Sequence, residues 1–143
     1  MCWASTWQYS RWAAEPHAHG PQIGAWLARA TDGMLGIAGV GAGSRVLDVA
    51  AGAGDQTLII AKRVGPVGHV LATDLSPAIL ALARDNALRA GLDNVQTQVA
   101  DGQDLRIEAG SFDAVVCRLG LINNELLLTT GRKPTVSKTA FAG

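Results

Sequence analysis

Three aspartates near the ends of apolar segments are the residues of this sequence best suited to ligand chemistry. Asp48 lies within VLDVA, Asp74 closes HVLATD, and Asp101 closes VQTQVAD. A carboxylate accepts hydrogen bonds from hydroxyl and amino groups and repels phosphates. Because an acid in an apolar strand is costly to bury, Asp48 favours a ligand role over a buried turn acid held by backbone amides. The structural alternatives for the other two acids are that Asp74 only precedes the helix cap at Ser76 and that Asp101 forms an Asx turn.

A glycine-containing turn follows the first of these acids. Residues 50–55 read Ala-Ala-Gly-Ala-Gly-Asp, directly after the segment that holds Asp48. Glycines allow the backbone to turn sharply and to approach a ligand closely, and the first amides of the next helix supply a local positive end. A Gly-x-Gly turn alone also serves ordinary tight turns, so its meaning depends on the surrounding elements.

Strands and helices alternate from residue 45 onward and would carry these residues. Short apolar runs predict strands, and apolar residues at helical spacing predict the helices between them. This order predicts an α/β fold, a Rossmann-like doubly wound parallel sheet whose ligands bind at the carboxyl ends of the strands. The predicted strands are 46–50, 69–74, 95–101 and 112–117, and the predicted helices are 21–35, 56–64 and 77–90.

The chain divides into three parts. Residues 1–40 are predicted to form an N-terminal helical cap, in which Trp3, Trp7 and Trp12 at helical spacing are more typical of packing on a core than of ligand stacking. Residues 41–121 hold the strand and helix units. Residues 122–143 fit neither pattern, and we expect a disordered tail there.

Composition excludes several classes of function. The chain has 143 residues, zero formal net charge, 48% hydrophobic and 17% charged residues, so no basic footprint for nucleic acid is present. No apolar run reaches the roughly 18 residues of a membrane span. Cys2 and Cys117 form no CxxC pattern, and His17 with His19 is too small a set for a metal site. We expect a cytoplasmic protein without a metal.

A dinucleotide-binding unit is the alternative from another enzyme class. Asp74 lies 20 residues after Gly54, as such a unit requires. Its third glycine, however, would fall at Thr57, and Asp48 and Asp55 would repel a pyrophosphate. The acids therefore favour a cationic ligand without phosphate over NAD(P).

Four motifs in the expected order resemble the class I S-adenosylmethionine (SAM) dependent methyltransferases. They are VLDVAAGAGD, ATDLSPAILALA, VADGQDL and SFDAVVCRLGL, within a resemblance that covers about residues 21 to 121. The sequence is most similar to the ubiquinone and menaquinone biosynthesis type. The resemblance implies SAM as the cofactor and a small-molecule methyl acceptor as the partner.

The resemblance also implies roles for single residues. Asp48 would orient the amine of SAM, Asp74 would accept hydrogen bonds from both ribose hydroxyls, and Asp101 would accept one from the adenine amino group. Arg118 would lie near the transferred methyl group, although its type is more often a surface charge. The sequence assigns no catalytic base, for which Tyr9, His17 and His19 are the candidates. The other implied contacts are Ala50, where many relatives have glycine, Gly52 and Gly54 around the methionine portion, Leu75 on the adenine, and Gly102 beside it.

The resemblance stops after Leu121. Relatives continue with a helix, a fifth strand and an antiparallel strand pair, whereas this chain reads INNELLLTTGRKPTVSKTAFAG, with Leu126 to Leu128 suited to one helical turn or a short strand. A sheet of four strands would leave the fourth as an exposed edge that favours self-association. We expect an altered reading frame or a truncated gene. A fragment completed by a partner and a noncatalytic SAM-binding protein are the alternatives.

Overall fold

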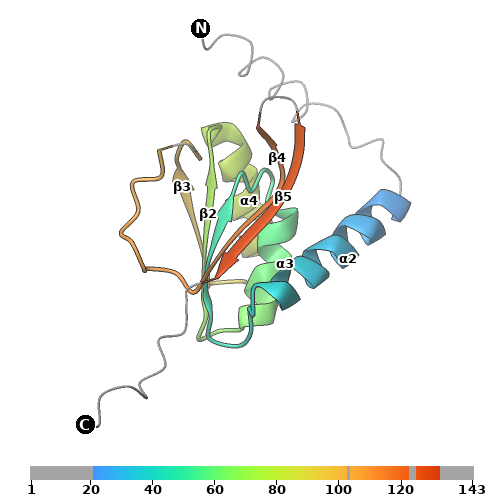
Figure 1. The fold of residues 1–143 in the computed structure, drawn as a ribbon, viewed down its shortest axis with the longest axis horizontal. Helices are drawn as coiled ribbons and strands as arrows, with labels where there is room; N and C mark the ends of the chain where they lie inside the picture. Colours follow the sequence, from blue (N-terminus) through green and yellow to red (C-terminus); the bar gives the residue numbers. More distant parts are fainter. Residues whose placement is uncertain (1–20, 103, 123–124, 133–143) are drawn as a thin grey trace, which may run out of the picture.

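The computed structural model describes residues 21–102, 104–122 and 125–132 as a sheet with helices packed on it (Figure 1). The tryptophans, tyrosine and two histidines of residues 1–20 lie outside the described residues. Up to residue 122 the elements follow the predicted order, with ends that differ by at most five residues. They are α2 (Pro21–Ile37), β1 (Arg45–Val49), α3 (Asp55–Val64), β2 (His69–Asp74), α4 (Pro77–Arg89), β3 (Val95–Val99), β4 (Ala114–Ile122) and β5 (Glu125–Arg132).

The sheet has the strand order β3-β2-β1-β4-β5, and its first four members are parallel. Leu47 of β1 lies opposite Leu71 of β2 and Val115 of β4. Strands β2 and β3 thus lie on one side of β1, and the later strands β4 and β5 lie on its other side. This reversal of strand order between β1 and β4 is the position where doubly wound sheets bind their ligands.

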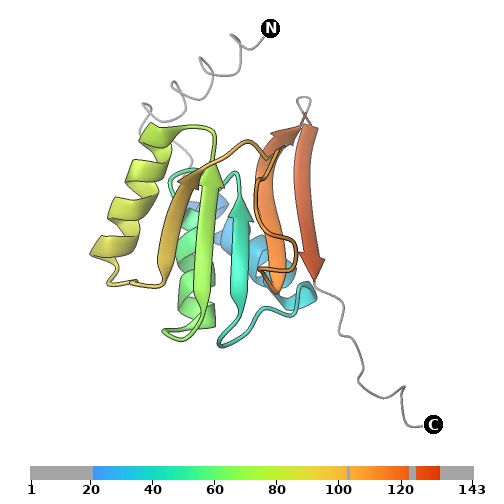
Figure 2. The ribbon, with the colours of Figure 1, turned by 90° about the vertical axis from the view of Figure 1, so that its left-hand side faces the viewer.

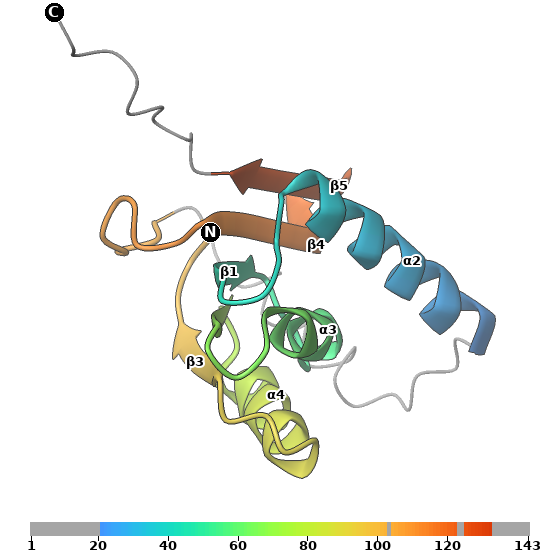
Figure 3. The ribbon, with the colours of Figure 1, turned by 90° about the horizontal axis from the view of Figure 1, so that it is seen from below.

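The connections lie on both faces of the sheet, which confirms the Rossmann-like doubly wound prediction. Helices α2, α3 and α4 lie on one face, and the described residues 100–102 and 104–113 between β3 and β4 lie on the other (Figures 2 and 3). Right-handed crossovers require this change of face when the direction of building reverses. No helix of the described part is long and apolar enough to span a membrane.

The core lies between the sheet and its helices. Val46, Val70 and Val116 are fully buried on the helix side of three adjacent strands, where Ile60 and Val64 of α3 join them. Apolar side chains of α3 therefore pack against the helix side of the sheet. Local signals set the helix boundaries as expected. Ser76 caps the start of α4 by accepting from the Ile79 amide at 3.4 Å, and Gly65 ends α3 with a positive φ of 69°.

Two backbone amides join the start of β1 to the residue before β4. The Arg45 amide donates to Oδ2 of Asp113 at 2.8 Å, and the Asp113 amide donates to the Arg45 carbonyl at 2.8 Å. The Arg45 guanidinium also lies 5.8 Å from the centre of the Phe112 ring. The parallel pair β1 and β4, which comes from distant parts of the chain, is thereby fixed in register.

Residues after Leu121 differ from the expectation. Glu125–Arg132 form strand β5, antiparallel to β4, with Ile122 opposite Glu125 and Ala114 opposite Arg132. The prediction of a disordered tail from residue 122 is therefore wrong for these residues, and so is the prediction that the fourth strand is the exposed edge. The apolar and β-branched run ELLLTT suits a strand, and its pairing satisfies the backbone groups of β4.

Candidate functional site

The predicted acids gather at the carboxyl edge of the parallel strands. Asp48 is the penultimate residue of β1, Asp74 is the last of β2, and Asp101 follows the end of β3. The turn of residues 50–54 joins β1 to α3 at the same edge, which is the upper one in Figure 2. The side chain of Asp74 meets this turn directly, because its Oδ2 accepts from the Gly52 amide at 3.0 Å.

Asp48 is fully buried and is held by the first turn of α3. Its Oδ1 accepts from Nε2 of Gln56 and its Oδ2 from Oγ1 of Thr57, each at 2.7 Å. Burial raises the pKa of Asp48 to about 6, against the opposing effects of Thr57, Gln56 and the Arg118 charge. The side chains of α3, rather than the backbone amides that we considered, thus satisfy this acid.

Asp74 is held in one orientation by two backbone amides. Besides the Gly52 amide at Oδ2, the Ser76 amide donates to Oδ1 at 3.1 Å. Each carboxylate oxygen has two lone pairs, so each retains acceptor capacity for a further donor. The arrangement presents a preset bidentate acceptor beside the turn of residues 50–54.

The turn has a left-handed backbone at three of its positions. Gly52 has φ 59° and Gly54 has φ 92°, and Ala50 with φ 55° is the one non-glycine residue with positive φ in the described part of the chain. The alanine that replaces glycine there thus occupies a conformation that costs an L residue energy. A β-carbon at Gly54 would lie 3.0 Å from the Ala83 Cβ, so glycine also lets the turn approach α4.

A side chain of α4 holds the same turn from the side. Nδ2 of Asn86 donates to the Ala53 carbonyl at 3.0 Å, and the Ala51 amide donates to the Thr73 carbonyl of β2 at 2.9 Å. The turn is therefore attached to β2 and α4 as well as to its own strand and helix. Such attachment reduces the ordering cost of binding a ligand.

Leu75, Asp101 and Gly102 form the outer part of the edge. Leu75 is 55% exposed, which leaves its apolar surface available to a ligand. Asp101 and Gly102 are exposed, and a β-carbon at Gly102 would lie 3.2 Å from Cγ1 of Val49. The structure places these residues at the ends of β2 and β3, as predicted.

Arg118 is directed toward α2. Its Nη1 donates to Oγ1 of Thr31 at 2.7 Å and to the Leu27 carbonyl at 3.2 Å. Burial lowers the pKa of Arg118, while Asp48 and Asp55 act in the opposite direction. Arg118 is thus not a free surface charge, and its hydrogen bonds tie β4 to α2.

Three residues of this region were missed by sequence reasoning: Thr31, Gln56 and Thr57. All are buried polar residues on the packing faces of helices. Thr31 lies four residues after Leu27 and three before Met34, on the apolar side of α2. A polar residue inside an apolar helical face is the signal that could have identified it, because such residues need a buried partner.

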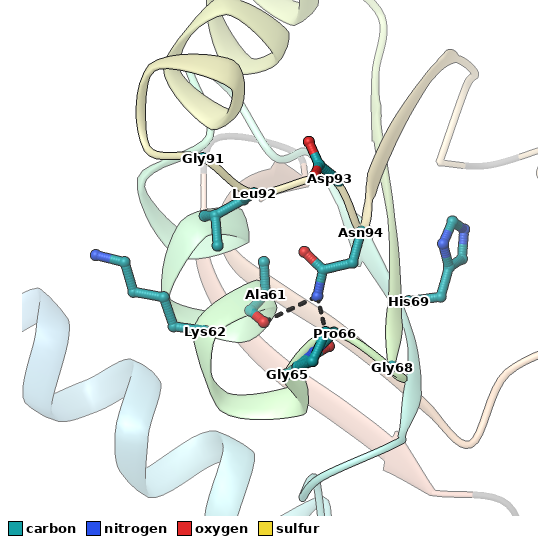
Figure 4. A pocket seen from close by; sticks show the side chains of 10 residues that line it. All are labelled: Ala61, Lys62, Gly65, Pro66, Gly68, His69, Gly91, Leu92, Asp93 and Asn94. Carbon is teal, nitrogen blue, oxygen red and sulfur yellow. Dashed lines mark hydrogen bonds between the residues drawn. The ribbon is translucent and has the colours of Figure 1, made fainter.

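A concave region lies at the opposite end of the sheet from the three aspartates. A pocket of about 680 Å³ is formed by the end of α3, the turn before β2 and the turn before β3, and Lys62, His69 and Asn94 line it (Figure 4). Nδ2 of Asn94 donates to the carbonyls of Ala61 at 3.0 Å and Gly65 at 2.8 Å. This pocket contains none of the aspartates at the carboxyl edge. The described residues also hold no group of three or more side chains suited to a metal ion.

Comparison of the sequence with known families gives one match that covers most of the strands and helices. Residues 46–130 match the family described as "Methyltransferase domain". The match extends past Leu121 into β5, further than the resemblance seen in the motifs.

Curated relatives and solved structures agree with this family. A ubiquinone/menaquinone biosynthesis C-methyltransferase of Pseudomonas fluorescens (strain Pf0-1) is 40% identical over 88 residues, covering 61% of this chain and 34% of its own. The corresponding protein of Ectopseudomonas oleovorans is 38% identical, with coverage of 61% and 52%. The chain thus spans between a third and a half of these relatives' length.

A SAM-dependent methyltransferase from Aquifex aeolicus superposes with a TM-score of 0.57 at 26% identity, covering 62% of this chain and 47% of its own. TrmN from Thermus thermophilus superposes with a TM-score of 0.57 at 33% identity, covering 62% and 26%. The strand order, the turn after β1 and these matches lead to one conclusion: the chain belongs to the methyltransferase domain family and has the Rossmann-like class I methyltransferase fold.

Proposed function

We propose that the carboxyl edge of the sheet binds SAM and that the protein transfers its methyl group to a small-molecule acceptor. The observation that carries the proposal is the carboxylate of Asp74, fixed by the Gly52 and Ser76 amides at the end of β2. A fixed pair of acceptor oxygens suits a ribose with two adjacent hydroxyls. The family membership and a solved relative, coclaurine N-methyltransferase bound to S-adenosylhomocysteine (SAH), point to the same ligand.

The adenosine end would occupy the outer part of the edge. Asp74 accepts from the ribose hydroxyls, the exposed Leu75 packs on the adenine, and Asp101 accepts from the adenine amino group. Gly102 keeps the backbone close to the base, since its neighbour Val49 leaves little room for a side chain. Apolar contact with a few fixed polar groups is the usual composition of a cofactor site.

The methionine end would lie along the turn of residues 50–54. Ala50, Gly52 and Gly54 line this turn, and Asp48 acts from beneath it. Because Asp48 is fully buried and holds Gln56 and Thr57, its contribution is to fix the first turn of α3 and to supply negative charge that helps to orient the amine. Arg118 contributes through α2, which belongs to the proposed N-terminal cap of residues 1–40.

Bound SAM would supply an electrophilic methyl group on a sulfonium. The residues of this chain would hold that group in line with an acceptor and exclude water, so that positioning and electrostatics lower the barrier. A proton acceptor for the nucleophile, where the acceptor molecule requires one, would come from Tyr9, His17 or His19. The second candidate function is SAM binding without methyl transfer, because the contacts that fix Asp74 concern the cofactor alone.

The cellular location and the partners proposed for the protein rest on its composition and on the edge of its sheet. A neutral chain with two cysteines far apart suits the cytoplasm and lacks a nucleic-acid footprint. The outer edge of β5 would offer a route to self-association, since β5 is now the last strand on that side of the sheet.

Calorimetry with SAM, SAH and NAD tests the proposal. We expect micromolar binding of SAM and SAH and at least a hundredfold weaker binding in Asp74→Ala, because two ribose hydrogen bonds to a charged group are lost. Asp85→Ala, which removes an exposed acid of α4, should bind like the native protein. Binding of NAD alone would contradict the proposal. Transfer of an isotope-labelled methyl group from SAM to a small-molecule extract separates the enzyme from the noncatalytic protein.

A further inference from the structure

A chain of four polar side chains, three of them buried, joins helix α2 to the carboxyl edge. Nη1 of Arg118 donates to Oγ1 of Thr31 at 2.7 Å, and this hydroxyl lies 3.5 Å from Oε1 of Gln56. Nε2 of Gln56 then donates to Oδ1 of Asp48 at 2.7 Å. The four side chains come from β4, α2, α3 and β1, so they connect elements that are far apart in the sequence.

Burial makes the members of this chain depend on one another. Thr31 and Asp48 are fully buried and Gln56 is 3% exposed, so water cannot replace a lost partner. Gln56 has a donor and an acceptor on one amide. With its nitrogen on Asp48, its oxygen must face Thr31, and the two neighbours together select its orientation.

Thr31 is the residue that α2 contributes to this chain of side chains. Its hydroxyl accepts from Arg118, and the single hydroxyl hydrogen is shared between the Leu27 carbonyl at 2.9 Å and Gln56 at 3.5 Å. Arg118 holds the same helical turn through the Leu27 carbonyl. The docking of α2 on the sheet is thus fastened at the residue that also faces Gln56.

The two charged members, Arg118 and Asp48, stand at opposite ends of this chain of side chains. Arg118 of β4 faces Asp48 of β1 and Asp55 of α3, and Asp74 of β2 is the other charge that acts on Asp48. Helix α2 contributes the neutral hydroxyl of Thr31 and the carbonyl of Leu27. The carboxylate and the guanidinium therefore compensate each other across two neutral side chains.

We propose that Thr31 and Gln56 are positioning residues, through which docked α2 and Arg118 hold Asp48 and the first turn of α3 in the geometry that binds the cofactor. The inference rests on the proposed function, and neither residue needs to touch the cofactor. Detachment of α2 removes a support from Gln56 and so from Asp48. By linkage, cofactor binding strengthens the docking of α2 to the same extent.

Variants of Thr31 and Gln56 test this role by calorimetry with SAH between pH 5 and 8. Thr31→Val keeps the shape but lacks the hydroxyl, Thr31→Ser keeps the hydroxyl, and Gln56→Leu removes the amide. Thr97→Val is the control, because it makes the same exchange on β3 at a residue that is not part of this chain of side chains. We expect Thr31→Val and Gln56→Leu to bind SAH about threefold to tenfold more weakly, as the loss of one hydrogen bond predicts. SAH binding should weaken at low pH, where Asp48 is protonated. In Thr31→Val and Gln56→Leu this loss should begin at higher pH, because the ionised form of Asp48 loses hydrogen-bond support. Thr31→Ser and Thr97→Val should match the native protein.

NMR titration of the Asp48 carboxyl carbon without ligand separates this inference from the proposed function. A higher titration midpoint in Thr31→Val, restored in Thr31→Ser, supports the chain of contacts, with circular dichroism to verify folding. Unchanged midpoint and affinity in Thr31→Val, or equal loss in Thr31→Ser, overturns the inference. Absence of SAH binding in the native protein overturns the proposed function and the cofactor role of the chain, whatever the titration shows.

Discussion

The carboxylate of Asp74 and the amide of Gly52 lie 3.0 Å apart, so the end of β2 and the turn after β1 are joined by a direct hydrogen bond. The acid predicted to bind a ligand thereby also sets the position of the turn predicted to surround it. Loss of Asp74 is therefore expected to affect both the ribose contact and the turn. Changes that act on the turn alone are needed to separate these effects.

Replacement of Ala50 by glycine is such a change. Ala50 has φ 55°, so Ala50→Gly relieves left-handed strain, and we expect a net gain of roughly 0.5–1 kcal/mol after the entropy cost of glycine in the unfolded chain. Urea unfolding measures this gain. Ala53→Gly, in the same turn without a positive φ, should lower stability instead. A loss of stability in Ala50→Gly would show that the methyl group makes a contact worth more than the strain.

Gly54 and Gly52 distinguish crowding from backbone strain. A β-carbon at Gly54 would meet Ala83 at 3.0 Å, whereas one at Gly52 would have nothing within 4 Å. We expect Gly52→Ala to cost about 1 kcal/mol from φ alone, and Gly54→Ala to cost about 2–4 kcal/mol from φ and overpacking together. Thermal or urea unfolding gives both values. Because the Ala83 Cα would also lie 3.1 Å from this β-carbon, Ala83→Gly in the Gly54→Ala background should recover only a part of the crowding cost. Equal costs of Gly52→Ala and Gly54→Ala would contradict this division.

The buried Asp48 predicts a stability that falls as the pH rises. Its pKa is raised from 3.8 to about 6, so the folded state binds the proton more tightly than the unfolded state between these values. Stability from this group is present below about pH 4, falls through the window and stays lower above pH 6, by about 3 kcal/mol from the shift. Asp48→Asn should flatten the profile of unfolding free energy between pH 4 and 7. Asp85→Asn, an exposed acid, should leave it unchanged, and a native profile that rises across this window would refute the assignment.

Asn94 links the end of α3 to the turn before β3. Its amide donates to the carbonyls of Ala61 and Gly65, so Asn94→Ala leaves two helix-terminal acceptors without this donor. We expect a loss of about 1–3 kcal/mol in urea unfolding, and a change within about 0.5 kcal/mol for the exposed neighbour in Asp93→Ala. Equal effects of the two variants would show that Asn94 acts only through the conformation of the turn.

The sequence predicted the elements that depend on local signals. Ser76-Pro77 identified the start of α4, and Gly65-Pro66 identified the end of α3, because caps and breakers act over a few residues. Apolar runs identified three of the four parallel strands, and the alternation of apolar and polar residues in VQTQVAD identified the other. Strand β5 was not predicted, since a short apolar run fits a helical turn as well as a strand until its partner β4 is known.

The site was predicted in its composition and only in part in its contacts. Asp48, Asp74 and the glycines lie where a parallel sheet must place them. The partners of Asp48 and the direction of Arg118 toward Thr31 depend on how α2 and α3 pack, which one sequence does not determine. The ligand contacts of Leu75, Asp101, Gly102 and Arg118 stay predictions.

The two hydrogen bonds between Arg45 and Asp113 join residues that are 68 positions apart in the sequence. Strands β1 to β3 with α3 and α4 form contacts between neighbouring segments, whereas β4 reaches β1 only after this long loop closes. Because distant contacts pay more loop entropy before they form, we expect the junction of β1 and β4 to assemble last. The turn of residues 50–54 and Asp74 would then take shape early in folding. The support from Arg118 would arrive with the final step, so folding would complete the binding site from the adenosine side toward the helix α2.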